Sequence, residues 1–344
     1  MNSISECIQI DAMQYYYKPI IPTQNQLSTS TKIVEQTDYV SNELAIHQMI
    51  LEIQKHQPNI SILHRFSTIH YFNPLSVCNV NDKCEFETNE NNRSFVMIKY
   101  TRNSVYIYDI SVFLNNKENR IYIHHILESY RHLLNSFIIL NQHNICFFHF
   151  SPQSIGFYDI DNPQCFLHGF ENSLQISMLS SKYIEMILSR IKQYTFHSFE
   201  IHILFYIMNH PEKWLSERTA HIVIQQYVDN MESNMPYIIT GFGNKMNYIR
   251  KCSDYLFPFL SFSKQKIIQQ ILKTHSTWDN YSLSILYLHY IQIMINSFNV
   301  NIPFLKAFQQ IALKNVSPLP TERQSLQQTL RMFQTLFQQY PHWK

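Results

Sequence analysis

The chain has 344 residues, 45% of them hydrophobic and 14% aromatic, which is enough to bury a large core and fits one large two-lobed domain. Its formal net charge is only +2 and 15% of its residues are charged, so the composition argues against nucleic acid or an acidic membrane as a partner.

The cysteines and the chain start indicate a reducing compartment. The six cysteines are scattered, and no CxxC, HExxH or other metal-ligand spacing occurs, so we predict free thiols and no metal site. The N-terminus lacks a basic region followed by an apolar core, so no secretory signal is predicted. The longest apolar stretches, 199–208 and 283–295, are shorter than the about 20 residues of a membrane span. We therefore expect an intracellular protein that is not secreted and has no membrane span.

The first hundred residues are predicted to be rich in strands. The segments with the aromatic and β-branched composition typical of strands are 13–21, 60–72 and 94–100. The polar run 22–31 is expected to be a loop. Thr37 or Asp38 can cap a helix that continues to Lys55, with an apolar stripe that includes Val40 and Leu44.

The central stretch, residues 126–170, has the most informative pattern. Its first part carries an apolar stripe at helical spacing, and a polar turn follows at 141–144. Three short apolar runs come next, at 145–148, 155–158 and 165–167. The sequence therefore predicts a helix, a loop and a hairpin in this order.

This stretch resembles the active centre of protein kinases. The run ILNQHNICFFHFSPQSIGF is similar, without a gap, to the kinase run YLHxxGIVHRDLKPENIL. The resemblance puts Phe147-Phe148-His149 where His-Arg-Asp is expected, Ser151 in place of the Lys and Ser154 in place of the metal-binding Asn. CFLHGFENS resembles KLIDFGLAS, so either Leu167 or His168 stands at the position of the Mg²⁺-binding Asp.

The expected carboxylates are missing from these positions. Phosphoryl transfer in kinases depends on positioning and on divalent metal ions, and Mg²⁺ prefers hard oxygen ligands. His149 could accept a proton as a general base, or it could be a packed residue with a structural hydrogen bond. No glycine precedes Gly156, so the glycine-rich loop that covers the phosphates is also absent.

The helix predicted at 38–55 resembles kinase helix C. The run HQMILEIQKHQPNI places Gln48 at the position of the Glu that pairs with the nucleotide-binding Lys, and Glu43 fits only if the helix is shifted. Lys18 or Lys32 precedes the helix, as the family order requires, whereas Lys99 follows it and is rejected. SFVMIKYTRNSVYIYDISVFL resembles the fifth strand, the hinge and helix D. The kinase hinge binds adenine through backbone groups only, so its chemistry does not depend on side-chain identity. The sequence is therefore compatible with weak nucleotide binding.

Three further motifs occur in the second half of the chain. HSFE resembles the APE motif and ends in Glu200, WDNYSLSILYLHYI resembles the start of helix F at Asp279, and PTERQS resembles PxxRxS with Arg323. The resemblance implies that Asp279 holds the backbone of the catalytic loop. It also implies a buried or half-buried ion pair between Glu200 and Arg323.

The spacing of these motifs implies an insertion at about 211–275. It contains several helical patterns, among them 220–231 and 264–273, and a turn-like segment at 240–244. Long insertions often carry binding surfaces. The insertion is therefore either a surface for a protein partner or helical packing material.

Together these motifs predict an α+β, bilobal protein-kinase-like fold. Residues 1–100 would form a small β-rich N-lobe, and residues 101–344 a mostly helical C-lobe. The chain resembles kinase-like proteins of large DNA viruses, which implies a location in a viral particle or the host cytoplasm. We expect a catalytically degenerate interaction or structural module without a cofactor. The alternative is a divergent Ser/Thr kinase that uses ATP and Mg²⁺, with carboxylates from elsewhere, such as Asp159 or Asp161.

Overall fold

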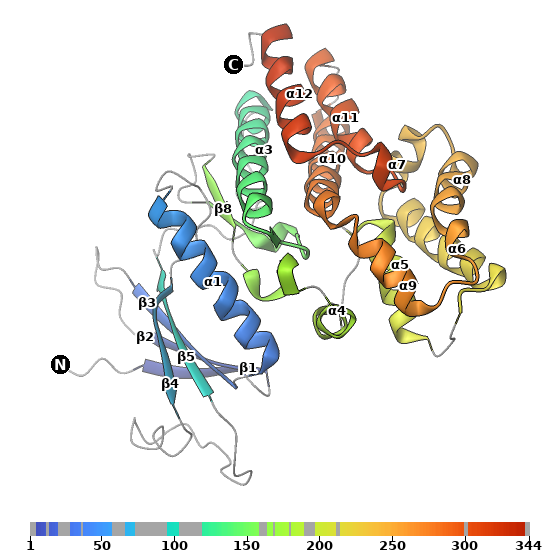
Figure 1. The fold of residues 1–344 in the computed structure, drawn as a ribbon. Helices are drawn as coiled ribbons and strands as arrows, with labels where there is room; N and C mark the ends of the chain where they lie inside the picture. The colour runs from blue at the N-terminus through green and yellow to red at the C-terminus, as the bar shows by residue number, and fades with distance from the viewer. Residues whose placement is uncertain are drawn as a thin grey trace.

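The chain folds into a β-rich part and a helical part in the computed structural model (Figure 1). The structure describes residues 5–11, 14–19, 28–35, 37–56, 66–72, 95–102, 119–157, 164–167, 169–178, 180–188, 197–210, 214–298 and 302–340. No described helix is both long enough and apolar enough to cross a bilayer.

The N-terminal strands form one antiparallel sheet with the order β1-β2-β3-β5-β4. Its strands are β1 (Ser5–Asp11), β2 (Gln14–Pro19), β3 (Ser28–Glu35), β4 (Phe66–Phe72) and β5 (Phe95–Arg102). Ser28 to Thr31 were predicted as part of a loop, and this prediction is wrong. They pair with β5, from Thr31 opposite Lys99 to Ser28 opposite Arg102, because a partner strand can recruit polar residues of modest strand preference.

Helix α1 (Asp38–His56) lies beside this sheet in Figure 1 and begins where the sequence predicted. The Thr37 hydroxyl accepts the Val40 amide at 3.3 Å, which makes Thr37 the capping residue. The helix buries Leu44, Ile46 and Ile50 toward the helical part.

The central stretch folds as a long helix followed by short paired strands. Helix α3 (Asn119–Gln142) leads into β6 (Ile145–Cys146), which pairs with β9 (Leu174–Gln175). A short 3-10 helix, η2 (Pro152–Ser154), precedes β7 (Ile155–Phe157), which pairs with β8 (Cys165–Leu167). The predicted order of helix, loop and hairpin is therefore present.

The remainder of the described chain is helical. Its elements are η3 (Phe170–Asn172), η4 (Ile176–Met178), α4 (Ser181–Leu188), α5 (Phe199–Asn209), α6 (Glu217–Asn234), α7 (Pro236–Gly241), α8 (Lys245–Leu256), η5 (Phe257–Phe259), α9 (Lys264–Leu272), η6 (His275–Thr277), α10 (Trp278–Phe298), α11 (Pro303–Asn315), η7 (Pro320–Glu322) and α12 (Leu326–Gln339). Helix α10 is buried over most of its length, because it lies between two hydrophobic clusters.

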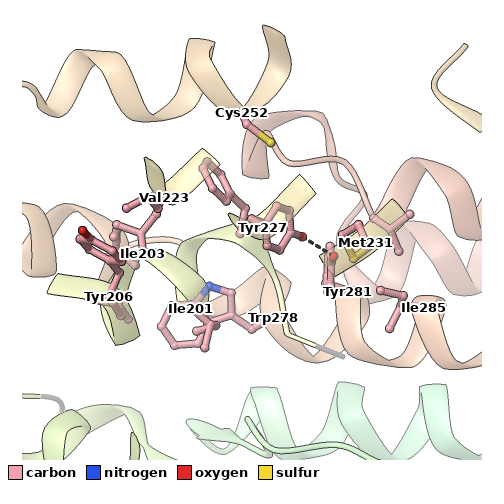
Figure 2. Close-up of a cluster of buried hydrophobic side chains, with 14 of the residues drawn as sticks. Ile201, Ile203, Tyr206, Val223, Tyr227, Met231, Cys252, Trp278, Tyr281 and Ile285 are labelled. Carbon is pink, nitrogen blue, oxygen red and sulfur yellow. Dashed lines mark hydrogen bonds between the residues drawn. The ribbon is translucent and has the colours of Figure 1, made fainter. Parts of the chain in front are cut away.

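The two clusters divide the helices between them. One cluster joins α3, α10, α11 and α12, and it receives three isoleucines of α1. The other joins α5, α6, α8 and α9 to α10, and Figure 2 shows its centre, where Ile201, Tyr227 and Trp278 come together. Segment 214–275, which covers most of the expected insertion, thus contributes side chains to the core.

Candidate functional site

The loop Phe147–Ser154, here called the anchored loop, is held by the carboxylate of Asp279. Asp279 is 2% exposed and lies in the first turn of α10. Its Oδ2 accepts a hydrogen bond from the Phe147 amide, and its Oδ1 accepts one from the Phe148 amide, each at 3.0 Å. The Cys146 thiol donates to Oδ1 at 3.5 Å. Asp279 therefore fixes the backbone of the loop, in the contact that the resemblance implied.

These bonds hold an unusual backbone conformation. Phe148 has a φ of 65°, in the left-handed region that a bulky side chain rarely adopts. The His149 amide donates to the Phe147 carbonyl at 2.7 Å, which closes a tight three-residue turn around Phe148. Such a strained turn persists where neighbouring contacts determine it, and here the Asp279 carboxylate supplies them.

Burial sets the protonation chemistry around Asp279. Burial raises the pKa of the Asp279 carboxyl group, while the bonds from the two loop amides act in the opposite direction. Burial also raises the pKa of the Cys146 thiol, and the neighbouring Asp279 charge adds to this effect. A buried thiol that stays protonated is a hydrogen-bond donor rather than a nucleophile.

His149 pairs with a second histidine, His197. Their Nδ1 and Nε2 atoms are 3.3 Å apart, and the His197 ring stacks on the Phe148 ring with centroids 5.6 Å apart. Burial lowers the pKa of His149. Burial, followed by the His149 charge, lowers the pKa of His197 to about 3. Both imidazoles are therefore neutral near pH 7, and a neutral imidazole can accept a proton.

Ser151 and Ser154 close the loop on itself. The Ser154 hydroxyl accepts the Ser151 amide at 3.3 Å and lies 3.5 Å from the His149 carbonyl, to which it donates. The two hydroxyl groups are 3.3 Å apart. Ser154 is buried at 7% exposure, so its hydroxyl is committed to the shape of the loop.

Phe147 joins the loop to α1 through a column of rings. Its ring contacts the edge of Phe170, with centroids 5.1 Å apart, and Phe170 contacts His47 of α1 at 5.7 Å. The Asn42 amide also donates to the Ser173 carbonyl at 2.9 Å. The helix that resembles helix C is thus attached to the segment that follows β8.

The residues expected to contact a nucleotide are only partly described. Gln48 lies on the exposed face of α1, whereas Glu43 is buried at 3% exposure. Helix geometry explains the difference, because positions five apart point to different faces. The side chain of Lys18 and the whole of His168 lie outside the described residues, so their expected roles stay predictions.

The residues in the metal-binding positions do not fit Mg²⁺. Leu167 has an apolar side chain and is fully buried, and the Ser154 hydroxyl is bonded within the loop. Among the described residues, no group of three or more His, Cys, Asp or Glu side chains could hold a metal ion. Mg²⁺ takes oxygen ligands, usually with carboxylates among them, and these two positions supply none.

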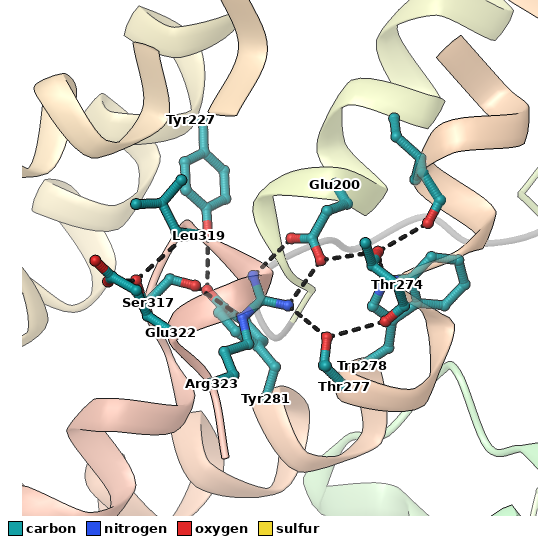
Figure 3. Close-up of polar contacts among 11 residues, drawn as sticks. Glu200, Tyr227, Thr274, Thr277, Trp278, Tyr281, Ser317, Leu319, Glu322 and Arg323 are labelled. Atoms are coloured by element: carbon teal, nitrogen blue, oxygen red, sulfur yellow. Dashed lines mark hydrogen bonds and ion pairs between the residues drawn. The ribbon is translucent and has the colours of Figure 1, made fainter. Parts of the chain in front are cut away.

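Glu200 and Arg323 form the ion pair that the sequence predicted, and both side chains are fully buried. Arg323 Nη1 and Nη2 donate to Glu200 Oε1 and Oε2 at 2.7 and 2.6 Å, in the two-pronged geometry of strong pairs (Figure 3). Nη1 also donates to the Thr277 hydroxyl at 3.0 Å, and Nε to the Ser317 carbonyl at 2.8 Å. Arg323 therefore joins α5, the short helix η6 that precedes α10 and the segment before α12.

Sequence reasoning missed His197 as a partner of His149. The two residues are 48 positions apart, so no local spacing signals the contact. The available signal was the position of His197 at the head of HSFE, next to the predicted Glu200. It also missed the contact between Asn42 and Ser173, which lie 131 positions apart.

Neither a protein-family model nor a curated protein matches the sequence. Among solved structures, the chain is similar to one described as "Titin kinase and its flanking domains", with 12% identity and a TM-score of 0.43. The match covers 95% of this chain and 45% of that chain. The chain thus spans less than half of the solved chain that it matches, and so distant a similarity does not say what it binds or does.

Proposed function

We propose that the chain is a catalytically degenerate kinase-like protein that acts as an interaction or structural module. One observation carries the proposal. Asp279 holds the anchored loop through two backbone amides, and the positions that would bear catalytic groups are Phe147, His149, Ser151 and Ser154. The contacts that shape the loop are present, while the side chains that would transfer phosphate are of other chemical types.

Two further features support a kinase-like framework. The Glu200–Arg323 pair joins the segments that resemble APE and PxxRxS. Helix α1 is attached to the segment after β8 through Asn42 and His47. The proposal includes a bilobal body, with the sheet and α1 as the smaller lobe. It also includes an intracellular site of action and an origin among kinase-like proteins of large DNA viruses.

A divergent Ser/Thr kinase is the alternative, and one observation favours it. Burial lowers the pKa of His149, so its imidazole is neutral near pH 7 and has a lone pair for a proton, while the same burial makes it a weaker base. His149 also occupies the position that the resemblance gives to the catalytic Asp. Against this, the described positions for metal ligands offer only a leucine and a bonded serine.

Thermal unfolding with ATP, with and without Mg²⁺ or Mn²⁺, tests the proposal. Ligand binding to the folded state raises stability by RT ln(1 + [L]/Kd), so ATP at about 100 times its Kd adds about 2.7 kcal/mol. For a chain of this length, that corresponds to a rise in Tm of roughly 4 °C. We expect no rise at millimolar ATP and no transfer of the γ-phosphate to a protein substrate.

Two restored variants provide the matched control. His149→Asp combined with Ser154→Asn and with either Leu167→Asp or His168→Asp, one for each register of the motif, returns three side chains of the family pattern, and the same assays are run on both variants. Transfer by the wild-type chain that disappears in His149→Ala would overturn the proposal and support the alternative.

A further inference from the structure

Two segments far apart in the chain form one surface at the edge of α6. The Ser261 amide donates to the Leu215 carbonyl at 3.1 Å, and Trp214 pairs with Ser263 as an isolated antiparallel bridge. The His221 ring meets the edge of Phe257, with centroids 5.3 Å apart. The segments 214–222 and 257–266 therefore lie side by side.

This surface is apolar and exposed at its centre. Trp214 is 59% exposed and Ile222 40%, and apolar side chains that gather on a surface often mark an interaction site. Phe259 and Phe262 are half-buried and pack against the core beneath, with their ring centroids 6.1 Å apart. An exposed tryptophan whose backbone pairs with Ser263, the residue after Phe262, has the composition of an interface hot spot.

The backbone of the surface is held in a strained form. Ser261 has a φ of 65°, which costs energy for a residue other than glycine. Its amide is fixed by Leu215, and the Leu260 and Phe262 amides bond within the turn. These bonds define the backbone conformation of the turn that carries Phe262.

The two segments of this surface also carry three cations. The Lys266 Nζ lies 3.6 Å from the Phe262 ring centroid, and the Lys264 ammonium group donates to the His210 carbonyl. Arg218 lies one turn before Ile222 on the exposed face of α6. None of these three cations forms an ion pair with another described residue, and the acid of the first turn of α6, Glu217, lies 3.9 Å from His221.

We propose that this surface, the Trp214 patch (Trp214, Arg218, Ile222, Phe262, Lys264 and Lys266), binds an acidic protein segment that carries an aromatic or aliphatic anchor. The inference rests on the proposed function as an interaction module and names its partner by chemistry. The anchor packs on Trp214 and Phe262, and its carboxylates face the three cations.

Charge also decides between this occupant and others. Two copies of the chain that met through the patch would bring like charges together, which disfavours self-association. Nucleic acid is bound through many phosphate contacts, whereas the patch has three cations and the whole chain a net charge of +2. A peptide with a few carboxylates and one apolar side chain matches both properties of the patch.

Selection of random peptides displayed on phage, with the full chain as bait, tests the proposal. We expect peptides that combine Asp or Glu with Trp, Phe or Leu. A selected peptide, labelled for fluorescence anisotropy, should bind about thirtyfold more weakly to Trp214→Ala, the loss typical of a hot-spot aromatic residue. Lys266→Glu should also weaken binding, and added salt should weaken binding to the wild type.

The controls are Met246→Ala, which removes another exposed apolar side chain (71% exposed), and Lys306→Glu, which reverses an exposed charge on α11. Both should bind the peptide as the wild type does. Circular dichroism checks that Trp214→Ala is folded, and Trp214→Phe should keep part of the affinity.

Three results would overturn the proposal. The first is a selection without acidic, apolar peptides, or with peptides that bind Trp214→Ala equally well. The second is a wild-type dimer that Trp214→Ala makes monomeric, which would make a second copy the occupant. The third is displacement of the peptide by an RNA oligonucleotide that binds more tightly. None of them bears on the phosphotransfer assay, so the proposed function is tested separately.

Discussion

Replacing Arg323 with Met should destabilise the fold strongly. Its guanidinium group makes four hydrogen bonds, two of them to Glu200, and both side chains are fully buried. After the change, the Glu200 carboxylate stays buried and keeps the Thr274 hydroxyl at 3.3 Å as a donor. Removing one partner of a buried pair costs about 3–5 kcal/mol, because an uncompensated charge is left behind.

The double variant Glu200→Met with Arg323→Met isolates the charge effect. It removes both charges, so no uncompensated ion remains, and it should be less destabilised than Arg323→Met alone. The two changes are therefore expected to be strongly non-additive in a double-mutant cycle. Arg323→Lys keeps the charge but loses the two-pronged geometry, and should fall between wild type and Arg323→Met.

Urea denaturation monitored by circular dichroism measures these free energies of unfolding. Arg131→Met serves as the surface control, since Arg131 pairs with Glu128 at 47% and 21% side-chain exposure. Its cost should be at most about 1 kcal/mol. The reasoning is refuted if Arg323→Met costs no more than this control, or if the double variant costs the sum of the two single changes.

Three further changes test other parts of the structure. Asp279→Asn should lower the free energy of unfolding, measured in urea, by about 1–3 kcal/mol. The asparagine side chain can accept a hydrogen bond from one of the two loop amides, but its NH₂ group faces the other amide, which is also a donor. The exposed control Asp254→Asn should have little effect. The pKa of His197 is about 3 in the folded state, against 6.5 for an ordinary histidine. As the pH falls below 6.5, the unfolded chain takes up this proton and the folded chain does not. The free energy of unfolding should therefore decrease, by about 2 kcal/mol at about pH 5. His197→Gln should remove that part of the pH dependence, and an unchanged slope would contradict the assignment. In Gly156→Ala the new Cβ would lie 2.3 Å from the Phe166 ring, so the variant should lose about 1–3 kcal/mol of stability, measured as a lower Tm. Adding Phe166→Leu should restore part of this loss. An unchanged Tm in Gly156→Ala would contradict the packing.

Local patterns predicted several of the helices and strands. The apolar stripe and the Thr37 cap predicted α1, and the stripe at 126–138 lies within α3, although the helix continues to Gln142. These signals succeed because residues a turn apart share one face of a helix. The pattern did not reveal β3 at Ser28, since pairing with β5 determines that strand.

The two predicted long-range contacts came from motif order. Asp279 meets the anchored loop across 132 positions, and Glu200 meets Arg323 across 123. No periodicity reports such contacts, and a resemblance alone linked these segments. Where the resemblance gave no partner, as for His197, the contact went unpredicted.

The sequence by itself determined which chemical groups the chain has at the positions of the kinase motifs. It has no glycine before Gly156, and it has phenylalanine, histidine and serine where the resemblance expects metal ligands and a base. Only the tertiary structure decided what those residues do. In the folded chain the Ser154 hydroxyl accepts a hydrogen bond from the Ser151 amide within the loop, and His149 contacts His197. One face of α6 is buried, whereas Trp214 is exposed. The chemical type of a side chain is a property of its own position in the sequence. Its burial and its hydrogen-bond partners depend on segments distant in the sequence, which come together only when the core packs.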